Sequence, residues 1–276
     1  MAKIGVCIEL FFTDRDYAER LRRVASLGFR YFEFWFHDKR FDGSKLIDEE
    51  KDIDRLADLC AELGLSCTDF VFNHPDGGVV ASLIDSRDHS IVLDNLEEMI
   101  SRANRMGCKQ LISGSGNRVP GLSTEKAIDN MTEVLTKAAG ICEKTDTTLI
   151  LEPFNTRVDH PDYFLDDPQI CVDVLKRVNH PNIKMLFDLY HMQIMSGNLL
   201  AFIQENLAYI GHFHIAGVPG RHEPENGELN YPFILRELDR LGYDRGFGLE
   251  YWPTGDPAQS LVNTKRWLET GSTGGR

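Results

Sequence analysis

Short apolar runs alternate with amphipathic segments along the whole chain. The apolar runs predict buried strands, and the segments between them place apolar residues at helical spacing. The predicted strands are 3–10, 31–36, 65–72, 109–114, 147–152, 183–188, 209–214 and 246–251. The predicted helices are 13–28, 49–63, 88–106, 123–144, 167–178, 198–208, 231–241 and 257–269, with Thr13 and Ser123 as the expected N-caps of the first and fourth.

These strand–helix units follow one another without a linker or a low-complexity break. Continuous apolar strands joined by helices are typical of a parallel sheet covered by helices. Eight units in a chain of 276 residues fit a (β/α)8 barrel. A doubly wound open sheet is the alternative, although no GxGxxG motif follows the first strand. We therefore expect an α/β fold, a single-domain TIM barrel over residues 1–270, and a frayed C-terminal tail over 271–276.

Charge and composition narrow the possible functions. The formal net charge of −13 opposes a nucleic-acid partner, because phosphate contacts need clustered Lys and Arg. The six cysteines show no CxxC pairing, which is typical of reduced, buried thiols. The N-terminus lacks a signal-peptide pattern, and no apolar run approaches the roughly 20 residues that a membrane helix requires. We expect a soluble cytoplasmic protein with no membrane partner.

Four predicted strands in succession end in a residue that can ligate a metal ion. These residues are Glu152, Asp188, His214 and Glu250. In a barrel of parallel strands the C-terminal strand ends share one rim, so the four side chains are expected to converge. Carboxylates crowded without a cation would raise one another's pKa. Hard oxygen ligands with one imidazole suit Mn²⁺, Mg²⁺ or Co²⁺, and the sequence therefore predicts one divalent metal ion.

Two further histidines, His212 and His191, lie near these predicted ligands and are interpreted separately. Strand alternation places His212 and His214 on the same face. We take His214 as the ligand because it lies nearer the strand end, and expect His212 to be packed or hydrogen-bonded one layer deeper. His191 lies one turn beyond Asp188 and is predicted to hydrogen-bond a substrate oxygen. A rim histidine bonded to the backbone is the alternative for His191.

The segment 212–231 is long, polar and punctuated by Gly and Pro, as expected of a functional loop after a strand. Arg221 within it suits an anionic or carbonyl-bearing substrate, because a guanidinium binds a carboxylate with two N–H groups. A surface salt bridge to Glu223 or Glu225 is the alternative interpretation of Arg221.

Four motifs carry a family resemblance: EPFN (152–155), DLYHMQ (188–193), GHFHIAGVPGRHEPENGELNY (211–231) and GLEY (248–251). They resemble the hydroxypyruvate isomerase family, one of the xylose-isomerase-like barrels, to which ketose 3-epimerases are related. The resemblance implies that the metal ligands are Glu152, Asp188, His214 and Glu250. It also implies Glu152 and Glu250 as the acid/base carboxylates, and His191 and Arg221 as substrate contacts.

The chain departs from these relatives at identifiable positions. Ketose 3-epimerases carry a substrate-binding Glu six residues after the first metal Glu, where this chain has Val158, followed by Asp159. Some hydroxypyruvate isomerases have Gln at the seventh-strand ligand, where this chain has His214. The rim of the first half is unusual as well, and we expect it to shape substrate choice, with His74 assigned to substrate binding beside Trp35, His37 and Asn73.

The predicted reaction moves a carbonyl between adjacent carbons of a short keto acid or ketose through a cis-enediolate. Glu152 and Glu250 would transfer the proton, and the metal ion would polarise the carbonyl. Alternatives are a ketose 3-epimerase, a keto-sugar dehydratase, an apurinic-type nuclease, which the charge opposes, and a non-catalytic sugar-binding barrel. Relatives often assemble, so a homodimer or homotetramer is also expected.

Overall fold

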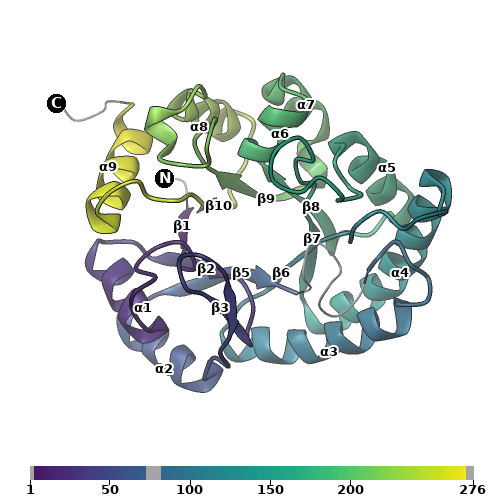
Figure 1. Ribbon diagram of the computed structural model, residues 1–276, viewed down its shortest axis with the longest axis horizontal. Helices are drawn as coiled ribbons and strands as arrows, with labels where there is room; N and C mark the ends of the chain where they lie inside the picture. The colour runs from purple at the N-terminus through teal and green to yellow at the C-terminus, as the bar shows by residue number, and fades with distance from the viewer. Residues whose placement is uncertain (1–2, 73–81, 272–276) are drawn as a thin grey trace. The chain divides into compact units, whose positions relative to one another are not determined.

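The computed structural model describes residues 3–72 and 82–271. Its parallel strands are β1 (Lys3–Cys7), β2 (Tyr31–Phe34), β5 (Ser66–Val71), β6 (Gln110–Ser113), β7 (Thr148–Leu151), β8 (Ile183–Asp188), β9 (Ile210–Ile215) and β10 (Gly246–Leu249). They form a closed barrel in the order β1-β10-β9-β8-β7-β6-β5-β2 (Figure 1). The predicted α/β barrel is confirmed.

The helices within the described residues are α1 (Tyr17–Ser26), α2 (Ile53–Leu63), α3 (His89–Arg105), α4 (Thr124–Thr145), α5 (Pro168–Val178), α6 (Leu189–Met195), α7 (Leu199–Asn206), α8 (Tyr231–Arg240) and α9 (Pro257–Thr270). Two short 3-10 helices are η1 (Leu207–Tyr209) and η2 (Pro224–Asn226). Ser123 caps α4 as predicted. The expected cap at Thr13 is wrong, because the Asp16 carboxylate accepts the Glu19 N–H at 2.8 Å and starts α1 there.

Two secondary-structure elements, a hairpin and a helix, were not predicted from the sequence. An antiparallel hairpin of β3 (Lys39–Phe41) and β4 (Leu46–Asp48) occupies the segment before α2, so that helix begins later than predicted. The Asp42 carboxylate accepts N–H bonds from Ser44 and Lys45 and thereby shapes the hairpin turn. The second missed element is α6, which begins directly after β8 because the Asp188 side chain caps it.

The chain divides into two compact units. Unit 1 comprises Met1–Thr68 and Phe213–Arg276, and unit 2 comprises Asp69–His212. In unit 1, β1 lies between β2 and β10, with Gly5 paired to Tyr31 on one side and to Gly248 on the other. Strands from both ends of the sequence therefore lie side by side in unit 1, as the purple and yellow-green ribbons show (Figure 1).

Unit 2 carries the parallel strands β6, β7 and β8 in one continuous register. Its core is fully buried and apolar, with Leu111 and Leu149 on the strands and Val134 on α4. All six cysteines of the chain are buried and free, as predicted. Among the described residues, no helix is both long enough and apolar enough to span a membrane.

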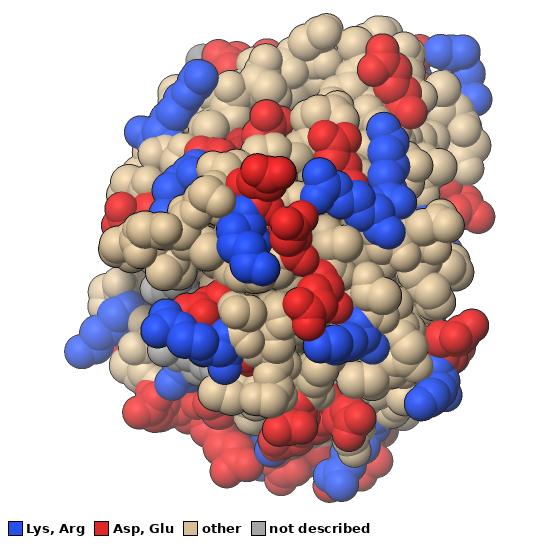
Figure 2. All heavy atoms as spheres, turned by 90° about the vertical axis from the view of Figure 1, so that its right-hand side faces the viewer, with Lys and Arg blue, Asp and Glu red and all other residues tan. Residues whose placement is uncertain are grey.

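The surface charge is mixed on the face drawn in Figure 2. Lys and Arg side chains stand among Asp and Glu side chains there, and acidic residues gather along the lower edge. That face carries no continuous basic patch of the kind that binds nucleic acid.

Candidate functional site

Glu250 follows β10, and its carboxylate contacts several polar side chains of unit 1. Its Oε1 accepts a hydrogen bond from the Trp35 indole at 2.8 Å and lies 3.9 Å from the Cys7 thiol. Its Oε2 lies 2.5 Å from Arg221 Nη2 and 3.0 Å from His214 Nδ1. Burial by itself would raise the pKa of Glu250, but His214 and Arg221 outweigh it and hold the pKa well below its ordinary value. The carboxylate is therefore held ionised.

Arg221 lies in the loop after β9, where it adopts a left-handed backbone conformation with φ of 57°. Its guanidinium contacts Glu250 rather than the neighbouring acidic residues that were the alternative partners. Those two glutamates accept hydrogen bonds from residues in and before α9, Glu223 from Thr254 and Ser260, and Glu225 from Thr264. The loop geometry thus directs Arg221 to the strand-end carboxylate.

His214 lies between two carboxylates of unit 1. Its Nδ1 lies 3.0 Å from Glu250 Oε2, and its Nε2 lies 3.1 Å from Glu33 Oε2. Glu33 is a buried residue of β2, and its Oε1 accepts a hydrogen bond from Thr68 Oγ1 at 3.2 Å. Sequence reasoning missed Glu33, although a Glu within the apolar run 31–36 was a visible signal.

In unit 2, Asp188 ends β8 and caps α6. Its Oδ1 accepts the backbone N–H of Tyr190 at 2.7 Å, and its Oδ2 lies 3.5 Å from His191 Nε2. The other ring nitrogen of His191 lies 2.7 Å from Asn155 Nδ2, which also donates to Asp159 Oδ2 at 2.7 Å. The backbone N–H of Asn155 donates to the same nitrogen at 3.3 Å, so His191 has both side-chain and backbone partners. Asn155 was missed as a site residue, although it ends the EPFN motif.

Glu152 and His212 are the remaining strand-end candidates of unit 2, and both are buried. Glu152 follows β7, and its backbone carbonyl accepts a hydrogen bond from the Tyr163 hydroxyl at 2.9 Å. His212 Nε2 lies 3.3 Å from Asp69 Oδ2. His212 is thus packed and has a polar partner, as the sequence led us to expect.

Buried acidic and histidine residues that could hold a metal ion occur in both units. In unit 1 they are Glu33, His214 and Glu250, and in unit 2 they are Asp69, Glu152, Asp188 and His212. The four predicted ligands are all among them. Carboxylate oxygens with imidazole nitrogens and no thiolate fit a hard divalent cation, so these residues suit the metal that the sequence predicts.

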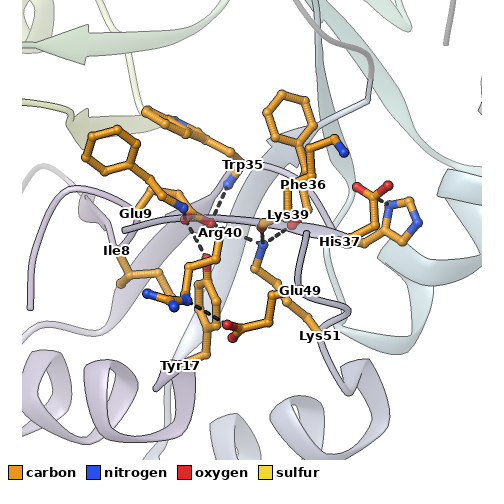
Figure 3. Close-up of polar contacts among 12 residues, drawn as sticks. Ile8, Glu9, Tyr17, Trp35, Phe36, His37, Lys39, Arg40, Glu49 and Lys51 are labelled. Carbon is orange, nitrogen blue, oxygen red and sulfur yellow. Dashed lines mark hydrogen bonds and ion pairs between the residues drawn. The ribbon is translucent and has the colours of Figure 1, made fainter. Parts of the chain in front are cut away.

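A second buried network in unit 1 supports the chain around Trp35 (Figure 3). Glu9 is fully buried, and its Oε1 accepts the backbone N–H of Trp35 at 3.2 Å. The Lys51 ammonium lies 3.3 Å from the same oxygen and donates to the backbone carbonyls of Phe36 and Lys39. Burial lowers the pKa of Lys51, which Glu9 partly restores. This network fixes the segment between β2 and β3, which carries Trp35.

The indole of Trp35 belongs to an aromatic cluster beside Glu250. Its ring centroid lies 6.1 Å from that of Phe41 and 6.4 Å from that of Trp252. Of the other predicted rim residues, His37 has its Nδ1 4.0 Å from Asp38 Oδ1. Asn73 and His74 lie outside the described residues.

Comparison with known proteins places this arrangement in a family. A family model described as a xylose isomerase-like TIM barrel matches residues 21–270. The chain belongs to the xylose isomerase-like TIM barrel family. The match covers β2 to β10, including every strand end from which a ligand was predicted.

Two relatives of this chain are isomerases by name, and a similar solved structure is described as an endonuclease. A putative hydroxypyruvate isomerase of Danio rerio is 33% identical over 291 residues, covering 100% of both chains. A 2-oxo-tetronate isomerase of Pectobacterium atrosepticum is 29% identical, covering 98% of this chain and 99% of its own. A crystal structure from Brucella melitensis, described as an AP endonuclease of family 2, has a TM-score of 0.82 at 31% identity, covering 95% of this chain and 97% of that one. The chain is an isomerase, and the predicted resemblance is confirmed.

Proposed function

We propose that the chain is a metal-dependent isomerase of short keto acids, with hydroxypyruvate or a 2-oxo-tetronate as substrate. It moves the carbonyl to the adjacent carbon through a cis-enediolate, and with hydroxypyruvate the product carries an aldehyde. The names of the relatives from Danio rerio and Pectobacterium atrosepticum support the substrate class.

One observation carries the proposal: four buried residues of types that can bind a metal ion lie at the C-terminal ends of parallel barrel strands. Asp188 and His214 lie within the last residues of β8 and β9, and Glu152 and Glu250 directly follow β7 and β10. In barrels of this type the chemistry occurs at the C-terminal strand ends. We propose that these four residues bind one divalent ion, Mn²⁺, Mg²⁺ or Co²⁺. When bound, the ion supplies a positive charge that polarises the substrate carbonyl and acidifies the α-proton.

Glu152 and Glu250 are the proposed acid/base pair. The depressed pKa of Glu250 keeps its carboxylate ionised, which is the form that accepts a proton. One of the two glutamates removes the α-proton, and the same or the other glutamate returns a proton to the neighbouring carbon. A carboxylate is a weak base toward such a proton, so the transfer depends on stabilising the enediolate as it forms.

His191 and Arg221 are the proposed anchors for the far end of the substrate, and His74 a further contact. The contact with Glu250 places the Arg221 guanidinium beside the proposed base, where it suits a substrate carboxylate. His191 is buried beside Asp188 and hydrogen-bonded to Asn155, which fixes the ring in place. A fixed ring next to a proposed ligand can hydrogen-bond a substrate oxygen without first being ordered.

The test is a substrate screen of the Mn²⁺-loaded protein read by NMR. Hydroxypyruvate, 2-oxo-tetronates and free ketoses are offered separately, and the products are identified. We expect the carbonyl of a keto acid to move, with loss of turnover in EDTA and recovery on adding Mn²⁺. Full activity of a verified metal-free protein would overturn the metal mechanism.

A ketose 3-epimerase is the second candidate and is separated by the same screen, because it changes only stereochemistry at one carbon. The loop after β7 bears on this choice. Val158, which replaces the substrate-binding Glu of the epimerases, is 67% exposed, and the Asp159 carboxylate is engaged by Asn155. Inversion of a free ketose without carbonyl movement would replace our proposal by the epimerase.

A further inference from the structure

Glu33 is a buried carboxylate that the proposed proton transfers do not use. It lies on β2 with 2% of its surface exposed. Its Oε2 is 3.1 Å from His214 Nε2, and its Oε1 accepts a hydrogen bond from Thr68. Burying an ionised carboxylate is costly unless it is paired, so the buried position of Glu33 calls for a role.

Two glycines make room for the Glu33 side chain. Gly5 on β1 pairs with Gly248 on β10, and Gly248 pairs with His214 on β9. A β-carbon at Gly248 would lie 2.1 Å from Glu33 Oε2, and one at Gly5 would lie 3.2 Å from Glu33 Oε1. The glutamate from β2 therefore crosses a pair of adjacent glycines to reach His214. Any side chain at position 248 would occupy the space of the carboxylate.

Each ring nitrogen of His214 lies close to a carboxylate oxygen. Nε2 lies 3.1 Å from Glu33 Oε2, and Nδ1 lies 3.0 Å from Oε2 of Glu250, a proposed metal ligand. A histidine that binds a metal through one ring nitrogen commonly donates the N–H of the other to a carboxylate. That second bond fixes both the tautomer and the orientation of the ring.

We propose that Glu33 is a positioning residue for the metal site. It holds the Nε2–H of His214 and thereby directs the lone pair of Nδ1 toward the ion, on the side where Glu250 lies. The inference rests on the proposed function in one respect, the assignment of His214 as a ligand. Glu33 is not one of the proposed ligands, and it affects metal binding only through His214.

Metal affinity provides the first test. Mn²⁺ binding is measured by isothermal titration calorimetry for the wild type, Glu33→Gln and Gly248→Ala, with Gly255→Ala as the matched control. A β-carbon at Gly255 meets no atom within 4 Å. We expect one Mn²⁺ per chain, bound about ten- to a hundredfold more weakly in Glu33→Gln and Gly248→Ala, and normally in the control. Circular dichroism identifies a variant that fails to fold. If Gly248→Ala does not fold, Glu33→Gln still tests the proposal, because it preserves the size of the side chain.

The tautomer of His214 provides the second test and does not depend on activity. Protein labelled with ¹⁵N-histidine is examined by NMR without metal, at a pH where the ring is neutral, and again with Mg²⁺. The His214 signals are assigned by their absence in His214→Gln. We expect Nε2 to carry the proton in the wild type and this preference to be lost in Glu33→Gln.

Several outcomes would overturn the positioning role. One is that Glu33→Gln binds Mn²⁺ with the affinity of the wild type. Another is that Nδ1 of His214 carries the proton in the Mg²⁺-loaded protein. A second Mn²⁺ that disappears in Glu33→Gln would make Glu33 a ligand instead. A wild type that binds no Mn²⁺ would overturn the proposed function, and the tautomer in the metal-free protein would still decide whether Glu33 orients His214.

Discussion

Glu9 and Glu33 are two buried carboxylates of unit 1, and each has a basic side chain beside it. Glu9 lies 3.3 Å from the Lys51 ammonium, and Glu33 lies 3.1 Å from the His214 imidazole. By distance and burial the two pairs are nearly equivalent. Their surroundings are not, and this difference assigns them different roles.

The remaining bonds of the basic partner distinguish the two regions. Lys51 also donates to the backbone carbonyls of Phe36 and Lys39, so its pair with Glu9 fixes the segment that leads into the hairpin. The second nitrogen of His214 lies 3.0 Å from Glu250 Oε2, so its pair with Glu33 orients a group of the proposed site. The role of a buried ion pair near a site therefore depends on which other groups its basic partner contacts.

The largest effect is expected from Glu250→Gln. The amide cannot accept the α-proton, so kcat should fall by about 10²- to 10⁴-fold and deuterium wash-in at the substrate α-carbon should cease. Proton exchange is followed by NMR in D₂O, with circular dichroism as the check on the fold and Glu152→Gln as the parallel variant. Unchanged wash-in in Glu250→Gln would remove this residue from the proton transfer.

Lys51→Met is expected to affect stability and not metal affinity. Removing the ammonium leaves Glu9 buried without its cation, which should cost about 3–5 kcal/mol in the free energy of unfolding. Urea denaturation measures this loss, and the double variant Glu9→Gln with Lys51→Met should recover part of it. Mn²⁺ affinity of the folded variant should stay normal, in contrast to Glu33→Gln. A large loss of Mn²⁺ affinity would break the distinction between the two regions.

Tyr17→Phe removes the hydroxyl that donates to Glu9 Oε2 at 2.5 Å. A hydrogen bond to a charged group contributes about 1.5–3 kcal/mol, and we expect a loss of that size at neutral pH. Burial and the charge of Glu9 raise the pKa of Tyr17 above its ordinary value of 10.0. Above that pH the unfolded chain releases the proton while the folded chain retains it, so the advantage of the wild type should shrink as pH rises. Denaturation at neutral and alkaline pH tests this, and a difference that grows with pH would contradict it.

Trp35→Phe is expected to have the smallest effect. Phenylalanine keeps an aromatic ring beside Phe41 and Trp252 but cannot donate to Glu250 Oε1. We expect about a tenfold decrease in kcat, the lower end for a hydrogen bond to a charged group, with little change in stability. Trp252→Phe is the matched control, because its indole is not the donor to Glu250. Equal losses in both variants would attribute the effect to packing.

The barrel could be predicted because its signals are local. Apolar runs and helical spacing identified every barrel strand, and four of those runs ended in the predicted ligand residues. The hairpin of β3 and β4 was missed because its residues are mostly polar and have no periodicity. Its position depends on Glu9 and Lys51, whose pairing is tertiary.

The supporting residues of the site could not be predicted for the same reason. Glu33 is distant in sequence from His214, and its role requires that Gly5 and Gly248 be neighbours in the sheet. Arg221 was predicted to contact the substrate because of its loop, but its contact with Glu250 follows from the path of that loop. The roles proposed for the site residues stay predictions, and these residues are Glu152, Asp188, His191, His214, Arg221, Glu250 and His74.

The pairing of β1 with β10 has a consequence for how the chain is assembled during synthesis. Unit 2 is a continuous stretch, whereas unit 1 combines the two ends of the sequence. One edge of β1 gains its partner only when the ribosome has passed Leu249, because Val6 pairs with that residue. Until then this edge exposes unpaired backbone groups, and such unpaired strand edges promote aggregation of nascent chains. The same residues that complete the sheet immediately precede Glu250, so a chain stalled before β10 lacks both the closing strand and the carboxylate.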